Sequence, residues 1–228
     1  YAPFGLKISS VTLGRLLTSL LSNFIGKWLF IYQDDILCYS QNEMDHKNNL
    51  LTLFEILNAA NLSINAKKTK LFKNKLTFLG YSLDSNGIQI RKDSIDAIVN
   101  LAYPNCKREI RSFLGSMNYF TKHIKNLHSI SAPLSKLTSS KRDFCFEDEQ
   151  KVAFNSLKQL LLEAPILGFP NYNERFYLNC DASGHAVGGC LTQEYTAKPV
   201  VIAYLSKALN TCQKNWSTID WECFAIFF

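Results

Sequence analysis

Apolar residues recur at helical spacing in several stretches of the chain. The first stretch predicts a helix soon after Lys7, with apolar positions at Val11, Leu16, Leu17, Leu20, Leu21 and Phe24. The second predicts a helix over residues 45–60, ended by Asn61, with an apolar face made of Leu50, Leu51, Leu53, Phe54 and Leu57. The pattern is helical again from residue 90 to about residue 140, and residues 148–163 predict one further amphipathic helix.

Other stretches have the β-prone composition of strands. Residues 29–40 predict a hairpin with Asp34 and Asp35 at its turn, and the apolar flanks on both sides are typical of buried strands. Near the end of the chain, residues 175–181, 186–192 and 199–205 predict three strands of an antiparallel sheet. Residues 167–171, which contain Gly168 and Pro170, predict a linker between the helical part and this sheet.

These elements indicate an α/β (α+β) fold. The chain has 228 residues, 47% of them hydrophobic, which is enough for one or two cores and suggests two domains. The seven cysteines form no Cys-x-x-Cys pair, which favours reduced thiols in the cytosol. No apolar stretch reaches the roughly 18 residues that a membrane span needs. We therefore expect a protein that is neither secreted nor inserted in a membrane.

The formal net charge of +6 permits a polyanionic partner, and the basic residues are clustered. One cluster contains Lys67, Lys68, Lys70, Lys73 and Lys75, and the other contains Lys107, Arg108, Arg111, Lys122 and Lys125. Taken singly, each charge is explained by a solvated helix or loop face. Taken together, they suggest contacts with phosphates, whose binding would weaken as the salt concentration rises.

The adjacent carboxylates of Asp34 and Asp35 are the most informative chemical feature. Two like charges set against a buried sheet repel each other and resist desolvation, so they call for a compensating cation. Mg²⁺ suits hard oxygen ligands, and paired Mg²⁺ ions serve phosphoryl transfer. The alternative is that Asp-Asp merely favours a tight turn.

The order of several motifs resembles the polymerase of gypsy-type long-terminal-repeat retroelements. Tyr32-Gln33-Asp34-Asp35 resembles the Tyr-x-Asp-Asp box of reverse transcriptases. Pro3-Phe4-Gly5-Leu6-Lys7 resembles the nucleotide-pocket segment, and Phe78-Leu79-Gly80 resembles the primer-grip hairpin. The remaining matches are Arg111-Ser112-Phe113-Leu114-Gly115 with Asn118-Tyr119-Phe120 for the thumb helix, then Ala132-Pro133-Leu134, Ala153-Phe154 with Leu157-Lys158, Ala164-Pro165-Ile166-Leu167, and Cys180-Asp181-Ala182-Ser183 for the first ribonuclease H strand.

The resemblance implies two metal sites. In the polymerase part it assigns Asp34 and Asp35 to Mg²⁺, and in the ribonuclease H part Asp181 and Glu222, with two ions per site and Mn²⁺ as an alternative. The stretch between Asp181 and Glu222 is long enough for a three-stranded meander and the start of a helix, so both carboxylates can meet at one end of the sheet. Without the family order, Asp181 would be read as a strand-end cap and Glu222 as a solvent-facing helical acid.

The resemblance also implies binding roles and domain limits. It assigns Phe4 and Gly5 to the nucleotide pocket, and Phe78, Leu79 and Gly80 to the primer grip. Because they cluster beside the primer-grip and thumb matches, we expect Lys67, Lys68, Lys70, Lys107, Arg108 and Arg111 to bind nucleic acid. The resemblance divides the chain into a partial polymerase palm (1–89), a helical thumb (90–143), a connecting helix and linker (144–171) and a truncated ribonuclease H-like domain (172–228). It implies a third polymerase carboxylate before Tyr1 and further ribonuclease H carboxylates after Phe228.

The chain also departs from the family pattern inside its motifs. The departures are Ile8-Ser9-Ser10 for Asn-Ala-Pro, Leu13 for Phe, Gly14 for Gln, Gln33 at a usually apolar place, Asn49 for His and His123 for Phe. These departures leave two classes of function open. The first is a fragment of a retrotransposon Pol polyprotein that acts as RNA-directed DNA polymerase and ribonuclease H. The second is a decayed or co-opted relic that binds nucleic acid without catalysis.

For the enzyme, the resemblance implies as partners an RNA/DNA template-primer, RNA-DNA hybrid, dNTPs and the remainder of the Pol polyprotein. It implies a location in a cytoplasmic retroelement particle or in the nucleus. Because both metal sites are incomplete, we expect the fragment alone to be inactive.

Overall fold

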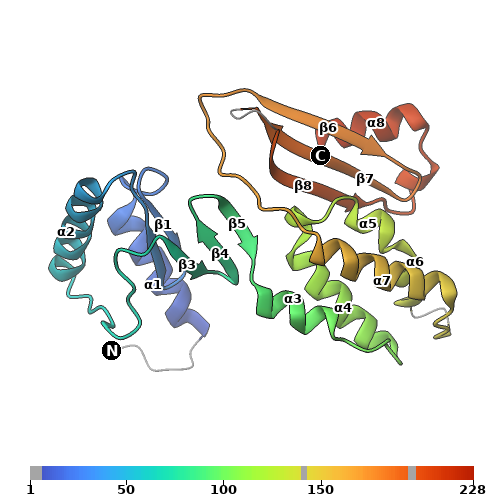
Figure 1. The fold of residues 1–228 in the computed structure, drawn as a ribbon, viewed down its shortest axis with the longest axis horizontal. Coiled ribbons are helices and arrows are strands. Elements are labelled where there is room, and N and C mark those ends of the chain that lie inside the picture. The colour runs from blue at the N-terminus through green and yellow to red at the C-terminus, as the bar shows by residue number, and fades with distance from the viewer. Residues whose placement is uncertain (1–6, 140–142, 195–198) are drawn as a thin grey trace. The chain divides into compact units, whose positions relative to one another are not determined.

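The computed structural model describes residues 7–139, 143–194 and 199–228, with side chains from Val11 onward (Figure 1). The chain forms two compact units, Tyr1–Asn74 and Lys75–Phe228. The mixture of helices and antiparallel strands confirms the predicted α/β (α+β) class. Within the described ranges we find no helix with the length and apolar character that crossing a membrane requires.

The first unit consists of two helices and a hairpin. Its elements are α1 (Lys7–Leu21), β1 (Leu29–Tyr32), β2 (Asp35–Cys38) and α2 (Glu43–Ala59). Their core is formed by Leu17, Leu21, Leu29, Leu53 and Leu57. Helix α2 begins two residues before the predicted start because the Asn42 side chain accepts the Asp45 N–H as an N-cap. Asn61 follows the helix with φ of 54°, as a residue that ends a helix often does.

One prediction about the hairpin was wrong. Both flanks were expected to be buried, but the Phe30 and Tyr32 side chains are 46% and 49% exposed. Successive side chains of a strand point to opposite faces, and only the face carrying Leu29, Ile31 and Ile36 packs into the core of this unit. The two-stranded sheet is therefore buried on one face only.

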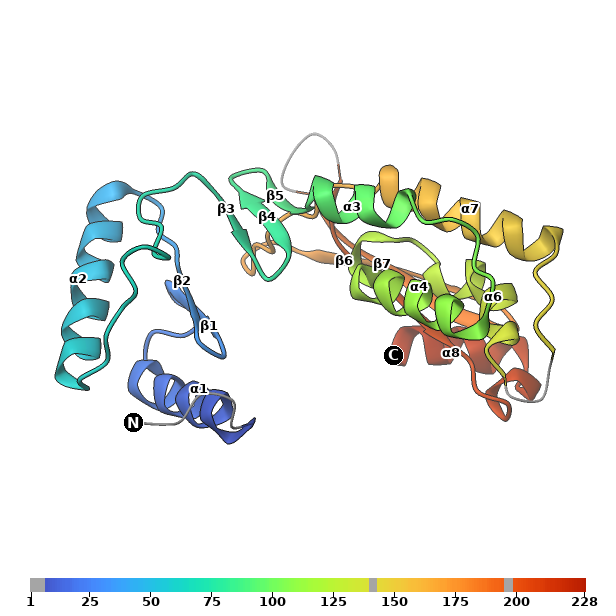
Figure 2. The same ribbon diagram turned by 90° about the horizontal axis from the view of Figure 1, so that it is seen from below.

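The second unit contains two three-stranded antiparallel sheets and a helical layer. The first sheet joins β3 (Lys75–Phe78), β4 (Tyr81–Asp84) and β5 (Gly87–Ile90). The helices are α3 (Lys92–Val99), α4 (Lys107–Tyr119), α5 (Leu127–Ile130), α6 (Ala132–Leu137) and α7 (Asp148–Leu162), and they lie together in Figures 1 and 2. They share a core that includes Ile110, Phe113, Met117, Phe154 and Leu157.

The second sheet matches the predicted meander. Its strands β6 (Phe176–Ala182), β7 (Ala186–Gln193) and β8 (Val200–Ala208) pair in sequence order, and α8 (Thr218–Phe227) follows. A capping box between Ser217 and Asp220 begins α8. Val187, Leu209 and Ala225 form a small core between this helix and the sheet.

Hydrogen bonds hold the predicted linker, residues 167–171, against both sheets. Leu167 exchanges backbone hydrogen bonds with Ile88, and the Gly168 N–H donates to the Val201 carbonyl at 2.8 Å. The Gln193 side chain is fully buried and bonds both backbone groups of Asn171, at 2.9 and 2.8 Å. The domain limits at residues 89, 143 and 171 remain predictions.

Candidate functional site

The structure confirms the acidic hairpin and fixes its register. Tyr32 pairs with Asp35, so Gln33 and Asp34 form a two-residue loop and Asp35 is the first residue of β2. Gln33 has a φ of 55°, which a two-residue hairpin loop commonly requires at its first position. Both carboxylates are exposed at the turn end of the hairpin, and one face of the hairpin packs on the core of this unit.

The acidic hairpin provides some of the ligands that a divalent cation needs. Exposed carboxylate oxygens are the ligands that Mg²⁺ prefers, and the hairpin holds two of them at neighbouring positions. In the described part of the chain, no group of three or more His, Cys, Asp or Glu side chains is placed to hold a metal ion. Asp34 and Asp35 therefore fit one side of a magnesium site and need further oxygen ligands.

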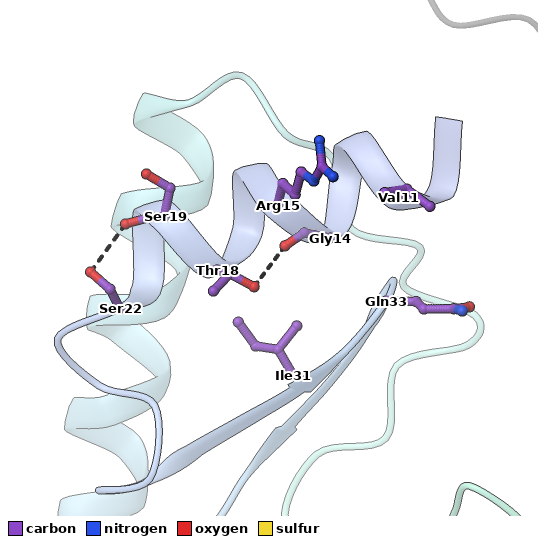
Figure 3. Close-up of a pocket in the computed structure, with 8 residues that line it drawn as sticks. All are labelled: Val11, Gly14, Arg15, Thr18, Ser19, Ser22, Ile31 and Gln33. Atoms are coloured by element: carbon purple, nitrogen blue, oxygen red, sulfur yellow. Dashed lines mark hydrogen bonds between the residues drawn. The ribbon is translucent and has the colours of Figure 1, made fainter. Parts of the chain in front are cut away.

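A shallow hollow of about 690 Å³ lies beside the acidic turn, between α1 and the hairpin (Figure 3). Ile31 points from the hairpin toward α1, and the hydroxyl of Thr18 donates to the Gly14 carbonyl. A Cβ atom on Gly14 would lie 3.6 Å from the Cα of Gln33. Gly14 and Gln33, which both depart from the family pattern, therefore lie against each other, and a Cβ atom at position 14 would make an ordinary van der Waals contact with the turn.

The predicted basic residues of the first unit lie on the loop after α2. Lys67, Lys68 and Lys70 are exposed, and none of them forms an ion pair with another described residue. The side chain of Asn65 accepts the backbone N–H groups of Lys67 and Lys68, which shapes the turn that carries them. Their ammonium groups remain available to an anionic partner. The predicted nucleotide-pocket residues Phe4 and Gly5 lie outside the described residues.

The predicted primer-grip segment is also a hairpin. Phe78 pairs with Tyr81, so Leu79 and Gly80 form a two-residue loop, with φ values of 46° and 75°. Positive φ at both positions matches the right-handed twist of the flanking strands. The sequence Phe78-Leu79-Gly80 thus ends a strand and forms a tight turn.

Aromatic side chains support this hairpin. The Tyr81 ring stacks on Tyr119 and on His123, with centroids 5.5 and 5.3 Å apart and interplanar angles of 13° in both cases. Burial, and secondarily the neighbouring Tyr119, raises the pKa of Tyr81 to about 12. The Tyr81 hydroxyl therefore stays protonated and acts as a donor at neutral pH.

His123 is 2% exposed, its Nε2 lies 3.4 Å from the Ile88 carbonyl, and its buried Nδ1 has no hydrogen-bond partner. Burial lowers the pKa of His123 from its ordinary 6.5. Because the folded pKa is the lower one, this residue's contribution to stability is complete above about pH 6.5 and is lost as the pH falls below it.

We expect His123→Phe to raise the free energy of unfolding by about 1 kcal/mol at pH 7, since an unpaired buried nitrogen is removed. It should also weaken the loss of stability between pH 7 and pH 5.5. Urea denaturation at both pH values measures this, with the exposed His185→Phe as control. A destabilised His123→Phe variant would show that the imidazole makes a net favourable contact.

The basic residues predicted for the thumb differ in what they contact. In α4, the Lys107 ammonium donates to the Ser139 carbonyl at 2.9 Å, and the Arg111 guanidinium donates to the Thr138 carbonyl at 2.8 Å. Both bonds satisfy carbonyl groups at the end of α6. Arg108 is exposed and has no hydrogen bond or ion pair with a described residue. Arg108 is therefore the member of this group best placed for a phosphate.

Asp181 lies in β6 on the face of the sheet that meets α5. Its register partner is Gly188, and Asn126 Nδ2 donates a long hydrogen bond of 3.4 Å to Asp181 Oδ2. A Cβ atom on Gly188 would lie 2.7 Å from Asn126 Oδ1, so a larger residue there would displace the Asn126 side chain. Asn126 itself has a φ of 53° and precedes α5. Sequence reasoning missed Asn126, because no local pattern marks it.

Glu222 is exposed on α8, which packs on the other face of the same sheet. Cys180 and Ala182, the neighbours of Asp181, face this helix, and the Cys180 thiol donates to the Ala225 carbonyl at 3.4 Å. Since adjacent strand residues point to opposite faces, Asp181 points away from α8. The structure thus places Asp181 on β6 and Glu222 on α8, the helix that packs on the same sheet, and their metal role stays a prediction.

Comparisons with known proteins match both parts of the chain. Residues 1–83 match the family model for reverse transcriptase (RNA-dependent DNA polymerase). Residues 146–228 match the model for the RNase H-like domain found in reverse transcriptase. Both families generally use divalent metal ions. The fold and the acidic hairpin therefore belong to a reverse transcriptase with a ribonuclease H-like domain.

The relatives define the group more closely. Two Drosophila melanogaster proteins, the retrovirus-related Pol polyproteins from transposons opus and gypsy, are each 32% identical and cover 99% and 98% of this chain. The chain spans 24% and 22% of their lengths. The chain corresponds to the reverse transcriptase and ribonuclease H-like region of gypsy-type retrotransposon Pol polyproteins, as the motif order predicted.

Solved structures support the fold. The foamy viral protease-reverse transcriptase in complex with RNA/DNA hybrid has a TM-score of 0.82 at 23% identity, covering 99% of this chain and 30% of that one. The same viral protein in complex with dsDNA has a TM-score of 0.79 at 24% identity, covering 96% of this chain and 45% of that one.

Proposed function

We propose that this chain acts, within a larger Pol polyprotein, in copying RNA into DNA and in cleaving the RNA of the resulting hybrid. The observation that carries the proposal is the acidic hairpin, which holds Asp34 and Asp35 exposed at its tip on a packed scaffold. Both carboxylates are proposed Mg²⁺ ligands. The chemistry that Mg²⁺ supplies when bound is activation of the attacking oxygen and stabilisation of the leaving oxygen.

The substrates follow from this chemistry. We propose an RNA template with a primer, dNTPs for extension, and RNA-DNA hybrid for cleavage. The basic loop with Lys67, Lys68 and Lys70 and the exposed Arg108 support a polyanionic partner. The names of the similar viral structures, which hold RNA/DNA hybrid and dsDNA, support the same class of partner. Polymerases accept any sequence, so we expect contacts with the backbone and little reading of base edges.

The experiment that tests this function is primer extension on an RNA template with Mg²⁺ and dNTPs, together with cleavage of a labelled RNA in hybrid. We expect activity when the chain is expressed with the flanking sequence of its polyprotein. We expect no robust extension by residues 1–228 alone, since Asp34 and Asp35 supply only part of a metal site. Robust extension by the 228 residues would overturn the view that ligands are missing.

A relic that binds nucleic acid without catalysis is not favoured. Asp34, Asp35, Asp181 and Glu222 are all present, and the match to Pol polyproteins covers nearly the whole chain. The departure at Gly14 does not prevent α1 from forming.

Arg108 gives a separate test of the binding surface. Log K for binding to double-stranded DNA falls as the log of the salt concentration rises. We expect Arg108→Ala to make this slope less steep by roughly 0.9, since one phosphate contact is lost. Lys151→Ala is the matched control, because the Lys151 ammonium already pairs with Asp148 at 3.0 Å. Fluorescence anisotropy over a range of salt concentrations measures both. Equal slopes for the parent chain and Arg108→Ala would assign Arg108 to a solvated helix face.

A further inference from the structure

The predicted primer-grip hairpin and the end of α4 are joined by two reciprocal hydrogen bonds. The Tyr119 hydroxyl donates to the Leu79 carbonyl, which belongs to the first residue of the loop. In return, the Tyr81 hydroxyl donates to the Tyr119 carbonyl at 2.9 Å. The two rings stack, so the pair connects the hairpin to the helix through both side chains and backbone.

The loop has the shape that this contact needs. Gly80 has a φ of 75°, and a Cβ atom on it would lie 3.0 Å from the Tyr119 hydroxyl. Any larger residue would press on that hydroxyl and adopt a strained backbone conformation. Tyr119 therefore lies on the side of the turn where Gly80 lacks a side chain.

The helix end that carries Tyr119 is firmly held. Tyr119 is the last residue of α4, whose opposite face places Phe113 and Met117 in the core, 3% and 0% exposed. Phe120, the next residue, packs edge-on against both tyrosine rings. Tyr119 itself is 53% exposed, so its hydroxyl is not required to fill the core. Its hydroxyl instead makes the polar contact with the Leu79 carbonyl.

We propose that Tyr119 is a positioning residue that sets the place of the Leu79–Gly80 loop relative to α4. The proposal rests on the proposed function and on the primer-grip role that the resemblance implies for Phe78, Leu79 and Gly80, by which this loop contacts the primer strand. A loop held at a fixed place keeps the primer end aligned for attack, and misplacement lowers the rate of the bound complex more than it lowers affinity. Tyr119 acts through the loop and has no contact with the reacting atoms.

The first test measures the loop directly in the 228-residue chain. Tyr119→Phe keeps the ring and its stacking but removes the hydroxyl. We expect amide hydrogen exchange across residues 78–81 to become about fivefold faster, as the loss of one hydrogen bond predicts. Tyr103→Phe is the matched control, because the Tyr103 hydroxyl bonds Asn155 elsewhere in the same unit. Unchanged exchange in Tyr119→Phe, or an equal change in both variants, overturns the proposal.

The second test measures the consequence in the chain expressed with its flanking polyprotein sequence. We expect Tyr119→Phe to lower kcat for primer extension severalfold, with the Kd for template-primer and the KM for dNTPs unchanged. Tyr103→Phe should match the parent in all three. Faster exchange with an unchanged kcat would overturn the positioning role. A parent that extends no primer would overturn the proposed function, and the exchange measurement would still decide whether Tyr119 holds the loop.

Discussion

Asp34→Asn is expected to lower the rate of primer extension about a thousandfold in the chain expressed with its flanking polyprotein sequence. The amide has nearly the same shape as the carboxylate but lacks its charge, so it is a poor ligand for Mg²⁺. If the metal ion stabilises the transition state by on the order of 4 kcal/mol, losing it slows the reaction about a thousandfold. Single-turnover extension of a labelled primer measures it.

The other properties of this variant should be close to those of the parent. Asp34 is exposed in a loop, so thermal stability and template-primer affinity should change little. Glu55→Gln is the matched control, since Glu55 is an exposed carboxylate on α2 of the same unit. If Asp34→Asn extends primers at the parent rate, Asp34 is a turn residue and not a metal ligand.

Asp181→Asn is expected to abolish cleavage of RNA in a hybrid and to leave primer extension intact. The substitution keeps an oxygen that can accept the hydrogen bond from Asn126, so the contact between α5 and the sheet should survive. What changes is the charge available to a metal ion. Comparing cleavage and extension in the same preparation separates a lost site from a misfolded chain.

The matched control for Asp181 is Glu174→Gln, which removes an exposed carboxylate just before the same sheet. It should cleave hybrid at the parent rate. If Asp181→Asn also cleaves hybrid at the parent rate, Asp181 is not a metal ligand. It is then the strand-end cap that the sequence offered as the alternative. Together, Asp34→Asn and Asp181→Asn should inactivate one activity each.

Local patterns predicted the elements well. The helical spacing of Leu50, Leu53 and Leu57 placed α2, and these residues are its buried face. The apolar, β-prone flanks on either side of Asp34 and Asp35 placed the acidic hairpin. These signals work because helices and hairpins depend on residues close in sequence. Their ends were less accurate, since the start of α2 depends on capping by Asn42 and the extension of β8 to Ala208 depends on pairing with β7.

Burial was harder to predict than secondary structure. Both flanks of the acidic hairpin were expected to be buried, but Phe30 and Tyr32 are exposed. Composition alone cannot tell a strand that is covered on one face from one covered on both, because the same apolar residues occur in each.

The sequence by itself determined the α/β class, the order of elements and the identity of the candidate ligands Asp34, Asp35, Asp181 and Glu222. Only the tertiary structure decided which side chains meet. It brought Tyr119 to Leu79 and Asn126 to Asp181, and it directed Lys107 and Arg111 to the end of α6. The physical reason is that such contacts join residues tens of positions apart, and packing selects them without leaving a periodic signal in the chain.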